Sequence, residues 1–291
     1  MKRTSIPDRV KAQLRKEVGF GCPVKGCGNP YLEYHHFDPP ISVRPHNEPS
    51  GMIALCAQHH KKADGGLYTV GQLHELKSDK ANAALVMGNL DWLRKDLLAV
   101  VGGSFFYKVP RILVVDNVDV VALHKDEDGY LRLSINMLSL LPEERIVIDR
   151  NEWRNIGSPL DLRCPPQGKE LEVIYDNGDF LHLRFFVIDD FASAIKKYPD
   201  ASGREMQQIS YPLTCVEVNF RAEGSGIDVT PSGAKLYSGT VKGSFISNCG
   251  GGIALGTPHK WLQNSKPAVP RAIHIPNTNV VRVDFCKVRK P

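Results

Sequence analysis

The sequence lacks a long apolar run. No stretch of its 291 residues approaches the about 20 apolar residues that a helix needs to cross a bilayer, and no basic and apolar leader precedes a small-residue cleavage site. We therefore expect a cytoplasmic protein without a membrane partner.

Internal repeats and low-complexity linkers are also lacking, which argues against solenoids and disordered chains. The hydrophobic fraction of 42% and the charged fraction of 24% are typical of globular proteins. A chain of this length is expected to form about two domains, one of them small.

The formal net charge is only +5, and most of the excess lies in the first third of the chain. The opening segment has one acidic residue, Asp8, before Glu17, and its basic residues are Lys2, Arg3, Arg9, Lys11, Arg15 and Lys16. Such a segment favours contact with phosphate, for which Arg15 is our candidate, although a solvated basic helix explains the charge equally well.

Local patterns predict an α+β protein in three parts. Residues 6–18 form an amphipathic helix with Val10, Leu14 and Val18 on one stripe, whereas residues 19–66 have little helical periodicity and need something besides a hydrophobic core. We expect a module over residues 1–68 and a helical connector over 69–103, with helices from Thr69 to about Lys77 and over 80–100.

Residues 104–291 alternate between short β-rich stretches and turn signals such as Asp128-Gly129. We expect a mainly antiparallel β domain of unknown ligand, with one helix around 189–197. This domain could also support a homo-oligomer.

Three of the seven cysteines lie close together near the N-terminus. Cys22 and Cys27 are spaced as C-x4-C, and Cys56 and His59 as C-x2-H. Two such pairs supply the number and softness of ligands of a closed tetrahedral zinc site. The alternative is a set of buried thiols with a chance histidine, but that would leave the segment without a stabilising core.

Four further polar residues lie inside this frame: His35, His36, His60 and Asp64. The strings GCPVKGC, LEYHHFDPP and GMIALCAQHHKKAD resemble the HNH nucleases whose ββα motif is held by a structural zinc ion. The resemblance covers roughly residues 15–66. The alternative is that the paired histidines are exposed surface residues without a role, or that they are zinc ligands in place of the others.

The resemblance implies a role for each of these residues. His35 and His60 would be ligands of a catalytic Mg²⁺ or Mn²⁺, Asp64 would complete the set, and His36 would be the general base. Asp64 follows His60 by four residues, so the two share a helical face. Because neighbours on a strand point to opposite faces, His35 and His36 need a kinked backbone to serve one site.

One family position differs. The asparagine that braces the loop of the base falls at Gly51, which has no side chain to perform that role. We predict Asn47 as its substitute, with His46 as the other candidate. Lys61 and Lys62, beside His60, are candidates for phosphate contact, and a solvated helix face is the alternative.

These features predict a metal-dependent HNH endonuclease that acts on DNA, in a role such as restriction or antiphage defence. A histidine that accepts a proton from water and a cation that neutralises phosphate charge are what phosphodiester hydrolysis needs. Two alternatives stay open. The chain could be a zinc-knuckle protein that binds nucleic acid without cleaving it, or a ligand-sensing β-domain protein that carries a zinc module.

Overall fold

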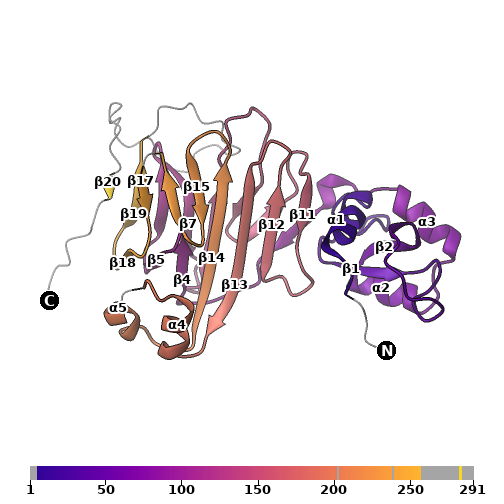
Figure 1. Cartoon of the computed structure of the whole chain (residues 1–291), viewed down its shortest axis with the longest axis horizontal. Helices are drawn as coiled ribbons and strands as arrows, with labels where there is room; N and C mark the ends of the chain where they lie inside the picture. The colour runs from indigo at the N-terminus through magenta and orange to yellow at the C-terminus, as the bar shows by residue number, and fades with distance from the viewer. Residues whose placement is uncertain (1–4, 202, 238, 257–281, 284–291) are drawn as a thin grey trace. The chain divides into compact units, whose positions relative to one another are not determined.

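The chain packs into two units in a computed structural model that describes residues 5–201, 203–237, 239–256 and 282–283. The first unit combines the residues up to Leu90 with Glu152–Asp176. The second combines Asp91–Asn151 with the residues from Asn177 onward. Few helices and many strands make up the described elements (Figure 1), so the predicted α+β class is confirmed at this level.

The first unit contains a short antiparallel hairpin. Strand β1 (Leu32–His36) pairs with β2 (Met52–Cys56) in regular register, and helix α2 (Ala57–Asp64) follows β2 directly. The other elements of this unit are α1 (Asp8–Glu17), the 3-10 turns η1 (Pro49–Gly51) and η2 (Ala83–Leu85), α3 (Val70–Ser78), β3 (Met87–Asn89), β10 (Glu152–Arg154), β11 (Asp161–Arg163) and β12 (Glu170–Ile174).

A small hydrophobic core supports this hairpin. The predicted stripe of Val10, Leu14 and Val18 on and beside α1 is buried, and it belongs to one core with all five residues of β2. Thr69 caps α3 as predicted, because its hydroxyl accepts a hydrogen bond from the backbone N–H of Gln72 and the Gln72 side chain accepts one from Thr69 N–H.

The second unit consists mainly of strands. Its elements are β4 (Leu98–Val101), β5 (Ser104–Tyr107), β6 (Arg111–Val115), β7 (Val118–Lys125), β8 (Leu131–Asn136), β9 (Val147–Asp149), β13 (Phe180–Ile188), α4 (Phe191–Lys197), α5 (Gly203–Gln207), β14 (Leu213–Ala222), β15 (Ile227–Thr230), β16 (Gly233–Leu236), β17 (Gly239–Val241), β18 (Phe245–Ser247), β19 (Gly251–Leu255) and β20 (Arg282–Val283). Helix α4 confirms the helix predicted around 189–197.

Within this unit, one set of neighbouring strands runs β20-β19-β6-β7-β8-β9. The other runs β13-β14-β15-β16-β17, with β4 on β14, β5 on β4 and β18 on β5. Most described pairs are antiparallel, as predicted, and the pairs β4 with β14, β5 with β18 and β6 with β19 are parallel.

The helix predicted over residues 80–100 is wrong, so the helical part of the 69–103 connector ends at Ser78. Between Ser78 and residue 103 the chain forms the single turn η2 and the strands β3 and β4. All four residues of β4 are buried, and β4 lies between β5 and β14. A short continuous apolar run suits a buried strand as well as a helix, and here the partners in the sheet decide the outcome.

The segment Glu152–Asp176 packs with the first unit, although it lies inside the predicted β domain of residues 104–291. Strand β11 lies against α1, and β10 pairs with β3. Gly88 on β3 permits a close approach, since a Cβ there would lie 2.6 Å from Trp153 Cζ2. None of the described helices is both long and apolar enough to cross a membrane.

Candidate functional site

The first candidate site is a cluster of three thiols and one imidazole. His59 Nδ1 lies 3.3 Å from Cys22 Sγ and 3.2 Å from Cys56 Sγ, and Cys27 Sγ lies 3.9 Å from Cys56 Sγ. Zinc bonds of about 2.3 Å to sulfur and about 2.0 Å to nitrogen, at tetrahedral angles, place neighbouring ligand atoms roughly 3.5–3.8 Å apart. The four residues therefore form a group that could hold a structural metal ion such as zinc.

Electrostatics match this donor set to a cation. Burial raises the pKa of the Cys22 and Cys56 thiols, and the charge of the nearby Cys27 raises it further. Burial also lowers the pKa of His59, which keeps its imidazole neutral and able to donate a lone pair. A bound cation would supply the positive charge that allows the thiolates to form.

Two short backbone features bring these ligands together. The turn between Cys22 and Cys27 is closed by a hydrogen bond from Gly28 N–H to Cys22 O. Gly28 has a positive φ of 62°, and a Cβ there would lie 2.5 Å from Leu85 O, so the turn requires glycine. At the other side, Cys56 is the N-cap residue of α2, which places His59 in the first turn of that helix.

The second candidate site consists of His35, His60 and Asp64, which also form a group that could hold a metal ion. Asp64 Oδ1 lies 3.2 Å from His35 Nδ1, and Asp64 Oδ2 lies 3.3 Å from His60 Nδ1. Metal bonds of about 2.1 Å at right angles place neighbouring ligand atoms roughly 3.0 Å apart, so these separations fit. Burial and the nearby His60 lower the pKa of His35, and its neutral form is the one that binds metal.

An unsatisfied atom marks this second group. His60 Nδ1 is buried and makes no hydrogen bond to the part of the chain that the structure describes. Two carboxylates lie close to it: Glu33 Oε2 is 3.5 Å away and Asp64 Oδ2 is 3.3 Å away. Buried polar atoms without a partner are costly, so this arrangement fits a cation between the donors. We did not predict Glu33 from the sequence, although its i, i+2 spacing from His35 on one strand face is a usable signal.

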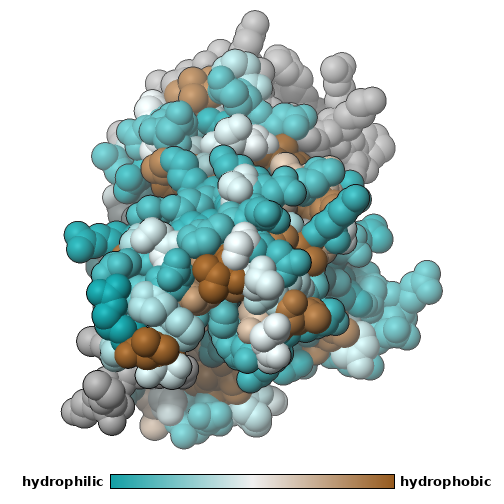
Figure 2. Space-filling view, turned by 90° about the vertical axis from the view of Figure 1, so that its right-hand side faces the viewer, coloured by the Kyte–Doolittle hydropathy of each residue, from teal (hydrophilic) through white to brown (hydrophobic). Residues whose placement is uncertain are grey.

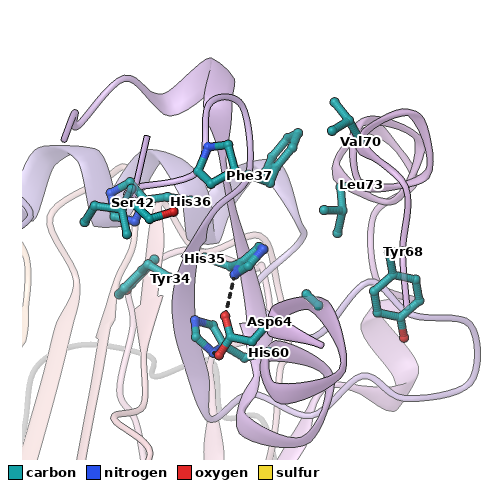
Figure 3. A pocket seen from close by; sticks show the side chains of 13 residues that line it. Tyr34, His35, His36, Phe37, Ser42, His60, Asp64, Tyr68, Val70 and Leu73 are labelled. Carbon is teal, nitrogen blue, oxygen red and sulfur yellow. Dashed lines mark ion pairs between the residues drawn. The ribbon is translucent and has the colours of Figure 1, made fainter. Parts of the chain in front are cut away.

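His36 lies on the other face of β1. The predicted kink between His35 and His36 is absent, since β1 and β2 keep a regular register through His36. The irregularity follows directly after it, where Phe37 N–H and Asp38 N–H both donate to Gly51 O at 2.9 and 3.2 Å. Figure 3 shows His36 beside Ser42, apart from the ion pair of His35 with Asp64.

The loop between β1 and β2 holds the His36 ring in place. His36 Nε2 lies 3.0 Å from the backbone oxygen of His46. A carbonyl can only accept, so Nε2 carries the proton and Nδ1 is the basic nitrogen. The predicted brace, Asn47, makes no side-chain hydrogen bond to any residue that the structure describes.

One pocket of about 340 Å³ is lined by residues from both faces of β1. His35, His60 and Asp64 line one part of it and His36 another, while Tyr68, Val70 and Leu73 stand across from them (Figure 3). In the described part of the chain β1 pairs only with β2, so its other edge is not paired with a strand. A group lying along that edge can contact side chains from both faces.

The three predicted phosphate contacts have different surroundings. Lys61 and Lys62 are exposed on α2. Arg15, in contrast, is 5% exposed and bonds to both carboxylate oxygens of Asp161 and to the Tyr34 hydroxyl, which leaves it unavailable to phosphate. The prediction that Arg15 contacts phosphate is therefore wrong.

The face in Figure 2 is mainly hydrophilic, and its apolar residues form separate patches.

Comparisons with known proteins add no guide to the site. No family model matches the chain, and no curated protein or solved structure matches it either.

Proposed function

We propose that this chain is a metal-dependent endonuclease of the HNH type that hydrolyses phosphodiester bonds in DNA. One observation carries the proposal: a single pocket is lined by His36, whose Nε2 is engaged by a carbonyl, and by the donor group His35, His60 and Asp64. A proton acceptor and a cation-binding group at one pocket are what hydrolysis by water requires.

His35, His60 and Asp64 would hold Mg²⁺ or Mn²⁺, and the cation supplies neutralisation of charge on the scissile phosphate and the leaving 3′ oxygen. His36 Nδ1 takes a proton from a water molecule whose oxygen forms the new bond to phosphorus. The bond from phosphorus to the 3′ oxygen breaks, and that oxygen keeps the electron pair. Proton removal by a positioned histidine typically contributes ~10²–10⁴-fold to the rate.

The cysteine cluster supports this function as a scaffold. It joins the Cys22–Cys27 turn to the end of β2 and the start of α2, and His60 follows the cluster's last ligand directly. A structural metal ion there would fix the helix that carries His60 and Asp64. The exposed Lys61 and Lys62 on the same helix would contact the DNA backbone.

The test is cleavage of supercoiled plasmid by the full-length, zinc-loaded protein with Mg²⁺ or Mn²⁺. We expect the wild type to nick or linearise the plasmid and the His36→Ala protein to retain DNA in a gel shift without cutting it. His124→Ala is the control, because His124 is a histidine on β7 in the second unit that does not line the pocket. Equal cutting by wild type and His36→Ala would contradict the assignment of His36.

Gly51, at the position of the family's asparagine, favours a second candidate function. The chain would then bind nucleic acid without cleaving it. The same assay separates the two, because such a protein shifts DNA in a gel and never cuts it with either ion.

A further inference from the structure

The loop of residues 37–51 carries a histidine that spans it from one side to the other. His46 Nε2 lies 2.9 Å from Pro39 O, near the start of the loop, and Glu48 N–H donates to His46 Nδ1 at 3.2 Å near its end. Because Nδ1 accepts from a backbone N–H, it carries no proton, and Nε2 must carry the proton that it donates to Pro39 O. Both hydrogen bonds therefore require the same neutral tautomer.

The same residue also contacts His36 through its main chain. His46 O accepts the hydrogen bond from His36 Nε2, and the two rings meet edge to face with centroids 5.1 Å apart. The position of this carbonyl decides which His36 nitrogen is protonated. Bonds that fix the backbone of residue 46 consequently fix the His36 tautomer.

The backbone at Gly51 leaves no room for a side chain that could brace the loop and position His36. A Cβ at Gly51 would lie 1.9 Å from Asp38 O and 3.0 Å from the His46 ring carbon Cε1. The same Gly51 oxygen accepts from Phe37 N–H and Asp38 N–H, so the close approach belongs to the end of the hairpin. An asparagine could not enter this backbone without displacing the loop and the His46 ring.

The other side-chain interactions that hold the loop are weaker or more local. The contacts of Arg44 with Glu48 and of His74 Nε2 with Asp38 Oδ2 are exposed, and such pairs contribute little. Lys77 Nζ bonds to Pro49 O, which lies beyond His46 toward β2. Among the described side chains, His46 alone joins Pro39 to Glu48.

We infer that His46 is the positioning residue of His36, and that it replaces the family's asparagine through its ring, which joins Pro39 to Glu48 and thereby holds its own carbonyl against His36 Nε2. The inference rests on the proposed function insofar as His36 is the general base.

The experiment compares His46→Ala, His46→Asn and His46→Gln in the full-length, zinc-loaded chain. The asparagine oxygen can replace Nδ1 toward Glu48, and the glutamine amide can replace Nε2 toward Pro39, so each keeps one half of the brace. One readout is plasmid cleavage with Mg²⁺. The other is the nitrogen NMR spectrum of ¹⁵N-histidine-labelled protein without Mg²⁺, which reports the His36 tautomer whether or not the protein cuts DNA.

We expect His46→Ala to lower kcat by roughly 10–100-fold with little change in KM, and the two half-brace variants to fall between it and the wild type. The His36 signals should change from the Nε2-protonated pattern to a mixture of tautomers. Arg44→Gln, in the same loop, is the control and should leave both readouts unchanged.

The inference is overturned if His46→Ala keeps both the wild-type rate and the His36 tautomer, or if Asn47→Ala produces the loss that we assign to His46. If His46→Ala fails to fold, as judged by lost zinc, the asparagine and glutamine variants carry the test. If the wild type never cuts, the proposed function fails, and a tautomer change in His46→Ala still supports the positioning by His46.

Discussion

Asp179 in the second unit and His60 Nδ1 in the first are both buried polar groups, yet their surroundings differ. The Asp179 carboxylate accepts from the Ser139 hydroxyl at 2.6 Å, from Arg145 Nε at 2.8 Å and from Glu223 N–H at 2.9 Å. His60 Nδ1 has two carboxylates nearby and no hydrogen bond within the described chain. The first arrangement is complete without a ligand, and the second would be completed by the cation that we propose.

The two units differ in their thiols as well. Cys22, Cys27 and Cys56 converge on one imidazole, whereas Cys215 in the second unit is a single buried thiol whose pKa is raised to about 12 by burial. An isolated buried thiol acts as a small apolar side chain. The thiols of the first unit thus form a group that could hold an ion, whereas Cys215 in the second unit packs as part of the core.

The largest expected effect is loss of the first unit's structure when the metal ion proposed for its cysteine cluster is removed. Binding of structural zinc by small domains contributes on the order of 10 kcal/mol, and this unit has only a small core. We expect Cys56→Ser to abolish stoichiometric zinc and to remove hydrogen-exchange protection from β1, β2 and α2, with protection retained in β13 and β14. Cys215→Ser is the control and should keep its zinc. Full hydrogen-exchange protection of the hairpin in zinc-free Cys56→Ser would contradict the claim that the first unit depends on a metal ion for its structure.

The next effect concerns the second unit. Asp179→Asn removes the carboxylate that pairs with the buried Arg145, and breaking a buried pair in this way costs about 3–5 kcal/mol. Asp228→Asn removes an exposed partner of Arg221 and should cost under about 1 kcal/mol. Urea unfolding of both variants measures the difference, and equal costs would contradict the role of burial.

Asp179 also makes the stability of the fold depend on pH in the acid range. Burial alone would raise its pKa, but the donors Ser139, Asn177 and Arg145 outweigh burial and hold it below the usual 3.8. A depressed carboxyl pKa stabilises the fold above the unfolded-state value. The contribution is therefore lost as pH falls through the lowered folded-state value.

A third effect concerns Glu33, which lies beside the donor group of His35, His60 and Asp64. If Glu33 orients His60 or shares its cation, Glu33→Gln should weaken Mn²⁺ binding roughly 10–100-fold, as loss of partners beside metal ligands does elsewhere. Mn²⁺ titration followed by electron paramagnetic resonance measures this. Glu48→Gln, an exposed glutamate on the loop, should bind Mn²⁺ as the wild type does. Unchanged affinity in Glu33→Gln would remove Glu33 from the site.

How much of this could be predicted from the sequence depends on the distance over which each contact acts. The zinc spacing, the His60 and Asp64 pair and the Thr69 cap each lie within a few residues, and local spacing predicted them. The partner of Arg15 is Asp161, 146 residues away, and no local pattern indicated it.

The path of the backbone also limited what could be predicted from the sequence. Asn47 and His46 are neighbours in the sequence, and only the path of the loop shows which one reaches Pro39 and Glu48. The apolar residues of β4 suited a helix until their partners in the sheet were known. The local path of the loop decided the first case, and the pairing of β4 with the distant β14 decided the second.

A smaller effect follows from pH. Burial and His60 lower the pKa of His35, so protons compete with a cation there only below the ordinary value of 6.5. Mn²⁺ affinity should be flat near neutral pH and fall as pH drops further, by up to about tenfold per pH unit once His35 is protonated. Titrations over a pH series test this. A steep decline that is already complete above pH 6.5 would contradict the lowered pKa.

The smallest effect is electrostatic. Lys61→Gln with Lys62→Gln should weaken DNA binding mainly at low salt and reduce the slope of log affinity against log salt by up to about two, since each phosphate contact contributes roughly one. Arg15 is buried against Asp161, so it should not enter this slope. Gel-shift titrations at several salt concentrations provide the measurement, and an unchanged slope would exclude both lysines.

The central claim is that two donor groups in the first unit select two different ions. Anomalous diffraction from Mn²⁺-soaked crystals of the zinc-loaded protein tests it most directly. We predict a zinc signal among Cys22, Cys27, Cys56 and His59, and a separate manganese signal among His35, His60 and Asp64. Manganese in the sulfur cluster, or none beside His35 in crystals that hold it elsewhere, would contradict the account.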